Sequence, residues 1–178
     1  MKFSIHQSIS VLEKTPWVVE QLIYDLPEEW IISNEGGETW SPFDIVGHLI
    51  HGERTDWIAR LEIILSDKAE KNFTTFDRFA QFRESKGKTL KDLLDEFKSL
   101  RAENIKILKS KNLTEKDFHL IGVHPVFGNV TLKNLIATWV VHDLDHLSQL
   151  SRVMAHQFRV EVGPWKEYLR ILNNFPTA

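Results

Sequence analysis

The sequence TLKNLIATWVVHDLDHLSQLSRVMAHQ, residues Thr131–Gln157, decides the fold of this chain. The stretch has helical length, contains no Gly or Pro, and begins with Thr131, a residue type that favours the N-cap position. At about 100° per residue, Leu135, Trp139 and Val153 fall on one stripe. Valine and leucine side chains cover much of the remaining circumference. We therefore expect a helix that is apolar nearly all round and runs through the core.

Two histidines, His142 and His146, lie on that same stripe, one turn apart. Side chains four residues apart project to neighbouring points, so the pair can occupy two corners of one metal ion. Burying two imidazoles is costly unless a metal or hydrogen bonds satisfy them, so a hydrogen-bonded core cluster is the alternative. Asp145 lies close enough to the stripe to orient a histidine, whereas Asp143 is expected to face a neighbouring element or solvent.

Capping signals mark the starts of two more long helices. Ser41-Pro42 precedes a helix that we expect to end near Ser66. Thr89 and Asp92 form a capping pattern before a helix that is expected to end near residue 110. Two less regular helical segments are also predicted. Residues 3–26 are expected to form either a single kinked helix or two helices, and residues 165–172 a short helix.

The connecting segments are polar or contain Gly and Pro. Residues 27–40 and 111–130 are predicted to be loops, the second with one turn near 114–118. Residues 67–88 carry four phenylalanines at spacings of three and predict a long irregular crossover whose rings lie on the bundle. No stretch alternates with period two over a convincing strand length. The pattern therefore predicts an all-α, antiparallel helical bundle.

A metal bound by the histidine pair needs a third ligand, and the second long helix offers His48, His51 and Glu53. Three protein ligands and one open position are typical of a catalytic site. Glu53 falls inside the buried stripe of its helix, whereas the helical wheel does not decide between the two histidines. Gly47 and Gly52 would allow another helix to approach closely. The remaining histidines are interpreted as surface residues: His6, His119, His124 and His156.

Composition excludes several function classes. The 178 residues favour a single domain over 1–178, and a net charge of −3 without a basic patch argues against nucleic-acid binding. The absence of cysteine excludes disulfides and thiolate metal sites, and it fits a cytoplasmic protein. No signal peptide or membrane-length apolar run occurs. The sequence contains no glycine-rich phosphate loop, so it gives no indication of a nucleotide, flavin or pyridoxal phosphate site.

Four motifs together resemble the DinB-like superfamily over nearly the whole chain. They are WSPFDIVGHL at 40–49, a later helix with Arg101, Gly128-x-x-Thr131-Leu132, and HDLDHLSQ at 142–149. The resemblance implies a four-helix bundle of up-down-down-up type, with a long crossover between the second and third helices. It also implies homodimers and one divalent metal ion (zinc, nickel or iron) held by three histidines, which fall here on His48, His142 and His146.

The better-understood relatives are thiol-dependent enzymes, including bacillithiol transferases and mycothiol-dependent isomerases. By this resemblance, the metal would lower the pKa of a low-molecular-weight thiol and supply a nucleophile for a small-molecule substrate. Glu53 would accept a proton or support a ligand. The same ligands would serve a metal-dependent hydrolase. The alternative from another class is a non-catalytic bundle that binds a metal or a small ligand.

Overall fold

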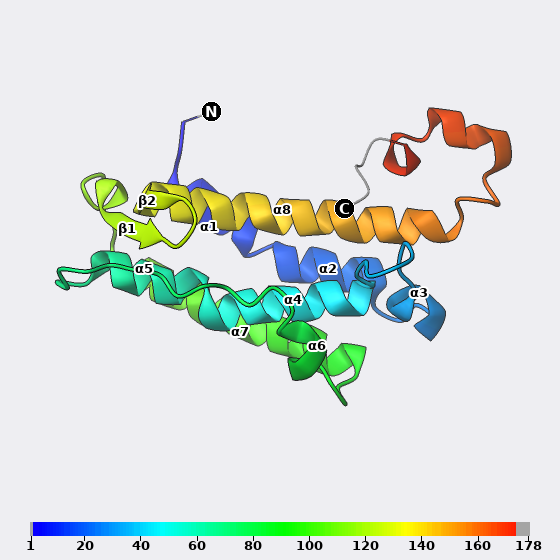
Figure 1. The fold of residues 1–178 in the computed structure, drawn as a ribbon, viewed down its shortest axis with the longest axis horizontal. Helices are drawn as coiled ribbons and strands as arrows, with labels where there is room; N and C mark the ends of the chain where they lie inside the picture. Colours follow the sequence, from blue (N-terminus) through cyan, green and yellow to red (C-terminus); the bar gives the residue numbers. More distant parts are fainter. Residues whose placement is uncertain (1, 174–178) are drawn as a thin grey trace.

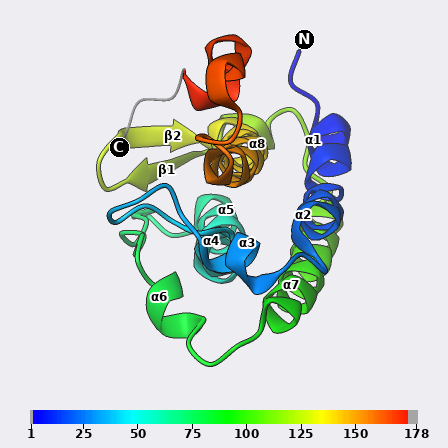
Figure 2. The same ribbon diagram turned by 90° about the vertical axis from the view of Figure 1, so that its right-hand side faces the viewer.

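The computed structural model describes residues 2–173 as a four-helix bundle in up-down-down-up order (Figure 1). The bundle helices are α1 (Ile5–Leu12) with α2 (Thr15–Ile23), α4 (Pro42–Thr55) with α5 (Trp57–Leu65), α7 (Leu90–Ser110) and α8 (Leu132–Gln157). Figure 2 shows these four positions end-on. The predicted bundle and the long crossover between its second and third positions are confirmed.

Capping boxes define the starts of the three long helices as predicted. The side chains of Ser41 and Thr89 accept hydrogen bonds from the backbone N–H of Asp44 and Asp92, and the aspartates accept from the backbone N–H groups of the caps. Thr131 caps α8 in the same way. Each box satisfies two backbone donors that a helix start otherwise leaves unpaired.

Several helix boundaries differ from the prediction. The helix expected from 42 to 66 breaks at Asp56, and the break turns Trp57 so that its ring stacks on Trp139 at 5.6 Å. Residues 3–26 form two helices. Short helices occupy parts of the predicted loop and crossover, namely α3 (Glu28–Ile32) and α6 (Gln81–Glu84). The C-terminal segment forms two 3-10 turns, η2 (Gly163–Tyr168) and η3 (Arg170–Leu172).

A β-hairpin replaces most of the loop predicted before α8. After the 3-10 turn η1 (Asp117–His119), β1 (Ile121–His124) pairs antiparallel with β2 (Gly128–Thr131). Val123 also exchanges backbone hydrogen bonds with the crossover, accepting from Phe73 N–H at 2.9 Å and donating to Lys71 O at 2.8 Å. The loop prediction was wrong because four-residue strands are too short to show a period-two pattern.

The expectation that α8 is apolar nearly all round and runs through the core holds for one face of the helix only. Val141 is 62% exposed and Leu144 is 49% exposed, so one face of the helix meets solvent. The opposite face carries the buried Leu135, Trp139 and Val153, as the predicted stripe required. None of the helices in the described part of the chain has the length and apolar character that a membrane span requires.

The core consists of two apolar clusters with a polar layer between them. One cluster joins α1, α5 and the first half of α8, and contains Trp57 and Trp139. The other joins α2, α4, the first half of α7 and the second half of α8, and contains Leu49 and Phe97. Buried polar residues from three of the bundle positions lie between the two clusters and form this layer. They are His48, His51 and Glu53 from α4, Arg101 and Asn104 from α7, and Asp143 and His146 from α8.

Gly122 lets the hairpin lie directly on the bundle. A Cβ at this position would come within 2.5 Å of the Phe73 ring and 2.8 Å of Ile64 Cγ1. Gly122→Ala should therefore lower the free energy of unfolding by about 1–3 kcal/mol through overpacking. Denaturant unfolding measures the loss.

The exposed Asn129 on the facing strand provides the control, because Asn129→Ala should change stability by less than about 0.5 kcal/mol. In the double variant Phe73→Leu/Gly122→Ala, the loss of stability caused by Gly122→Ala should be smaller than in the otherwise wild-type chain, because the phenylalanine ring that the new Cβ would meet is gone. A neutral Gly122→Ala would contradict the close packing.

Candidate metal centre

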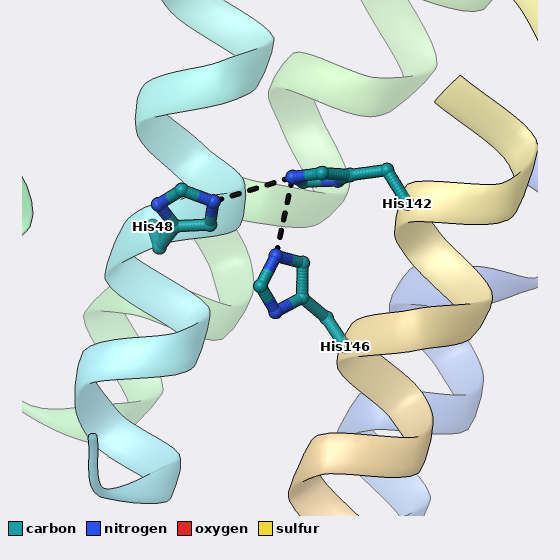
Figure 3. A group of neighbouring side chains, drawn as sticks. All are labelled: His48, His142 and His146. Carbon is teal, nitrogen blue, oxygen red and sulfur yellow. Dashed lines mark hydrogen bonds between the residues drawn. The ribbon is translucent and has the colours of Figure 1, made fainter. Parts of the chain in front are cut away.

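Three histidine side chains from two helices converge in the polar layer. His48 comes from α4, and His142 and His146 come from successive turns of α8 (Figure 3). The Nε2 atom of His142 lies 3.2 Å from Nε2 of His48 and 3.1 Å from Nε2 of His146. One nitrogen of each ring lies within 4.8 Å of the others. The structure therefore brings together the three histidines named from the sequence.

The protons available to these rings do not satisfy all the nitrogens. Nδ1 of His146 lies 2.7 Å from the side-chain carbonyl oxygen of Gln149, which only accepts, so Nδ1 carries the proton and Nε2 presents a lone pair. Nε2 of His142 holds either one proton or one lone pair, so it cannot complete a hydrogen bond with both His48 and His146. A cation would satisfy the facing lone pairs of all three rings at once.

The spacing and charge of the rings also fit a metal ion. Two nitrogens that bind one zinc ion at about 2.1 Å in tetrahedral geometry lie about 3.4 Å apart, close to the separations seen here. Burial and the neighbouring histidines lower the pKa of His48 to about 3 and that of His142 to about 2. Burial also lowers the pKa of His146. All three rings are therefore neutral at pH 7, as metal binding requires.

Aromatic rings face each histidine. Trp40 lies 4.7 Å from His48 and stacks on His146 at 6.2 Å, between ring centroids. Phe76 meets His48 edge-on at 5.4 Å, and Trp57 meets His142 edge-on at 5.1 Å. These rings exclude water from the flanks of the histidines and fix their orientation by packing.

A cavity of about 1410 Å³ lies beside the three histidines. His48, His142 and His146 contribute to its lining, and exposed residues such as Phe79, Val126 and Phe127 bring it to the surface. The cavity is larger than the 300–1,000 Å³ typical of a site for one small ligand. A substrate can therefore reach the histidines.

Arg101 forms the centre of a buried ionic network beside this cavity. It donates from Nη1 and Nη2 to the two carboxylate oxygens of Asp143 at 2.6 and 3.0 Å, and from Nη2 to Glu53 at 2.8 Å. Nη1 also donates to the backbone oxygen of Leu12 at 2.7 Å. Burial alone would lower the pKa of Arg101, but the two carboxylates raise it, so the guanidinium stays charged.

The network places the helices that carry the histidines. Asp143 directly follows His142 on α8, so the two side chains point to different sides of the helix, one to Arg101 and one to the cavity. Glu53 lies on α4 five residues after His48 and is also bound by Asn104 of α7 at 2.9 Å. The contacts of Arg101 therefore restrain the rotation of α4 and α8 about their axes.

Comparison with known proteins identifies the family. The model of the DinB superfamily matches residues 12–150, which is most of the chain. The chain belongs to the DinB superfamily. The solved structure of YfiT from Bacillus subtilis, described as a probable metal-dependent hydrolase with an unusual four-helix bundle topology, is similar with a TM-score of 0.69. The match is 19% identical in sequence and covers 88% of this DinB chain and 90% of YfiT. A search of curated proteins found no match.

The other site residues predicted from the sequence lie apart from the three histidines of this DinB chain. Glu53 is bound by Arg101, Asn104 and Trp139 Nε1, and burial raises its pKa. His51 is buried with Nδ1 3.2 Å from Glu84. Asp143 faces a neighbouring helix, where it pairs with Arg101 of α7. This is one of the two orientations predicted for it, the other being toward solvent.

Asp145, which was predicted to orient a histidine, is exposed and lines the cavity, and the hydrogen-bond partner of His146 Nδ1 is Gln149 instead. The cavity lining also includes residues that the sequence interpretation did not assign to it. His124 and His156, interpreted as surface residues, also contribute to the lining. Gln149 shares the helical stripe of His142 and His146, and its position three residues after His146 is the signal that predicts its contact with that ring. Trp57 gave no such signal, because its orientation depends on the break at residue 56.

Loss of the central guanidinium should destabilise this DinB chain severely. Arg101→Met leaves Glu53 and Asp143 buried without a counter-charge, so the free energy of unfolding should fall by about 3–5 kcal/mol. The matched control is Arg54→Met, because Arg54 makes its ion pairs with Glu84 and Glu96 in partial contact with solvent. Its loss should cost at most about 1 kcal/mol in the same denaturant titration. Equal losses would contradict the central role of Arg101.

The histidine pKa values predict that acid weakens the metal-free protein. Since the pKa values of His48 and His142 are lowered in the folded chain, the unfolded chain binds more protons below the ordinary value of 6.5. The free energy of unfolding should therefore fall between about pH 7 and pH 5, by about 2 kcal/mol per histidine. Denaturant unfolding with a chelator present measures this loss.

The double variant His48→Gln/His142→Gln lacks both titrating rings and is the control. Its stability should fall less over the same pH range, by a difference of about 4 kcal/mol. Other titrating groups are shared by both proteins and cancel in this comparison. An equal loss in the two proteins would show that these rings are protonated in the folded chain.

Proposed function

We propose that this protein is a divalent-metal-dependent enzyme of thiol S-transferase type, with His48, His142 and His146 as the metal ligands. The observation that carries the proposal is the convergence of three neutral rings whose facing nitrogens hydrogen bonds cannot all satisfy. Zinc, nickel and iron all suit such a nitrogen donor set. The cavity beside the rings gives a substrate access to them.

A bound divalent ion supplies Lewis acidity, which lowers the pKa of a thiol or of water. The chain holds the ligands in place. Gln149 fixes the proton of His146 on Nδ1, and Trp40 and Trp57 pack against the rings. In this proposal Glu53 positions α4 instead of accepting a proton, since its carboxylate is engaged by Arg101 and other donors.

The size of the cavity favours thiol transfer. Because the chain contains no cysteine, the thiol nucleophile in this proposal comes from a separate small molecule. The cavity volume of about 1410 Å³ leaves room for both a low-molecular-weight thiol and an electrophile. Metal-dependent hydrolysis is the second candidate, favoured by the fold shared with YfiT. The homodimer implied by the family resemblance stays a prediction, which sedimentation measures.

Metal content tests the site. Untagged protein should contain about one metal ion per chain, and the His142→Ala/His146→Ala double variant should contain almost none. The exposed His119 provides the control, since His119→Ala should retain the metal. Gln149→Leu should weaken metal affinity by about 10- to 100-fold, and Gln149→Glu, which keeps an acceptor, should weaken it less. Undiminished metal in the double variant would rule out the ligand assignment.

Activity assays then separate the two reaction classes. The metal-loaded protein should accelerate consumption of cysteine by 1-chloro-2,4-dinitrobenzene, and the double variant should not. Hydrolysis of p-nitrophenyl acetate without thiol is the parallel assay. Activity in the second assay alone would replace thiol transfer with hydrolysis, and inactivity in both, with metal bound, would contradict both catalytic proposals.

A further inference from the structure

The crossover between α5 and α7 contributes a wall of the cavity. Phe76, Arg78 and Phe79 all line it, and all three come from the phenylalanine-rich segment noted in the sequence. Phe76 reaches furthest in, because its ring contacts both His48 and His51 at centroid distances of 5.4 and 5.0 Å. Three of the four phenylalanines of this segment, Phe73, Phe76 and Phe79, thus line the cavity as well as covering the bundle.

Arg78 is the unusual member of this wall. Other arginines in or near the crossover have carboxylate partners, as Arg83 has in Asp77 at 2.6 Å and Arg60 has in Asp56 at 2.5 Å. Within residues 2–173, no such partner occurs for Arg78. Its guanidinium is therefore available to an anion that enters the cavity.

The charges around the histidines are arranged asymmetrically. Arg78 belongs to the crossover segment whose Phe76 ring packs against His48 of α4, whereas Asp145 lies on α8 directly before His146, and both side chains line the cavity. Arg78 therefore acts on the α4 side of the histidine group and Asp145 on the α8 side. An anionic group on a ligand would therefore be attracted to the positive charge of Arg78 and repelled by the negative charge of Asp145.

The crossover is held at both ends, which restrains the backbone that carries the exposed side chain of Arg78. Before it, Phe73 donates its backbone N–H to Val123 of the hairpin at 2.9 Å. After it, α6 packs on α4 at Gly47, where a Cβ would lie 2.5 Å from Ser85 Oγ. Figure 2 shows the hairpin and α6 on the same side of α4 and α5. The segment between these two attachments contains Phe76, Arg78 and Phe79.

We propose that the cavity binds a substrate with a carboxylate or similar anionic group, which pairs with Arg78, and an aromatic or apolar body, which lies against Trp40 and Phe76. This inference rests on the proposed function, because it names the class of electrophile that the same site takes. A guanidinium binds a carboxylate through two parallel N–H groups, so it fixes the orientation of the substrate as well as its charge. Arg78 is a specificity residue and not a metal ligand.

A matched pair of probes tests the inference. Binding of 4-phenylbutyrate and of its neutral amide, 4-phenylbutyramide, is measured by calorimetry and by quenching of tryptophan fluorescence, since Trp40 and Trp57 line the cavity. The wild-type protein should bind the acid about tenfold more tightly than the amide. Arg78→Gln should remove this preference and leave amide binding unchanged. Asp145→Asn should increase it by about twofold, because a repulsive charge is lost.

The control is Arg83→Gln, on the same crossover but paired with Asp77, which should keep the preference. Equal binding of acid and amide by the wild type, or an unchanged preference in Arg78→Gln, would overturn the inference. The metal content of Arg78→Gln should equal that of the wild type. A preference that depends on Arg78 in a protein that binds no metal would support the anion site and remove the proposed function, so the two failures are distinguishable.

Discussion

The bundle depends on the buried guanidinium of Arg101, which is 2% exposed and bonded to α4, α8 and the end of α1 at once. Burying an arginine with two carboxylates carries a large desolvation cost, and well-packed apolar residues often give equal or greater stability. Stability alone therefore does not explain the network. The geometric effect of the network explains it better. Apolar contacts tolerate a helix that slides or rotates slightly, whereas a bidentate ion pair does not. The network sets the relative position of α4 and α8, and that position brings the histidines together.

The histidines depend on a second constraint, which is that three largely buried rings remain neutral at the wall of the cavity. Burial and mutual repulsion make protonation costly, so nitrogen lone pairs persist at neutral pH. The same burial leaves Nδ1 of His48 and of His142 without a hydrogen-bond partner, whereas Nδ1 of His146 is bound by Gln149. The chain thus gives up hydrogen bonding and some stability for a preformed set of donors. Natural proteins often accept such a cost at functional sites.

Features coded by neighbouring residues could be predicted from the sequence, and features that depend on distant partners could not. The starts of α4, α7 and α8 follow from capping residues, and the pairing of His142 with His146 follows from their spacing alone. Choosing His48 required the family resemblance, because the helical wheel shows burial without showing the partner. Glu53 illustrates the limit: its buried position was predicted correctly, but its bonds come from Arg101, 48 residues away. The hairpin and the exposed face of α8 depend on packing that no local pattern records.

The two attachments of the crossover separate the part of the molecule that holds the ligands from the part that surrounds the substrate. Residues 74–80 lie between the hydrogen bond at Phe73 and the packing of α6 on α4, and they contribute nothing to the ionic layer at the centre of the bundle. Exchanges in this segment at positions other than Phe76, which packs on His48, can therefore change the shape and charge of the cavity while the three histidines keep their positions. Relatives with the same bundle could diverge in substrate through this short stretch alone. It is also the natural place to randomise in directed evolution of a new specificity.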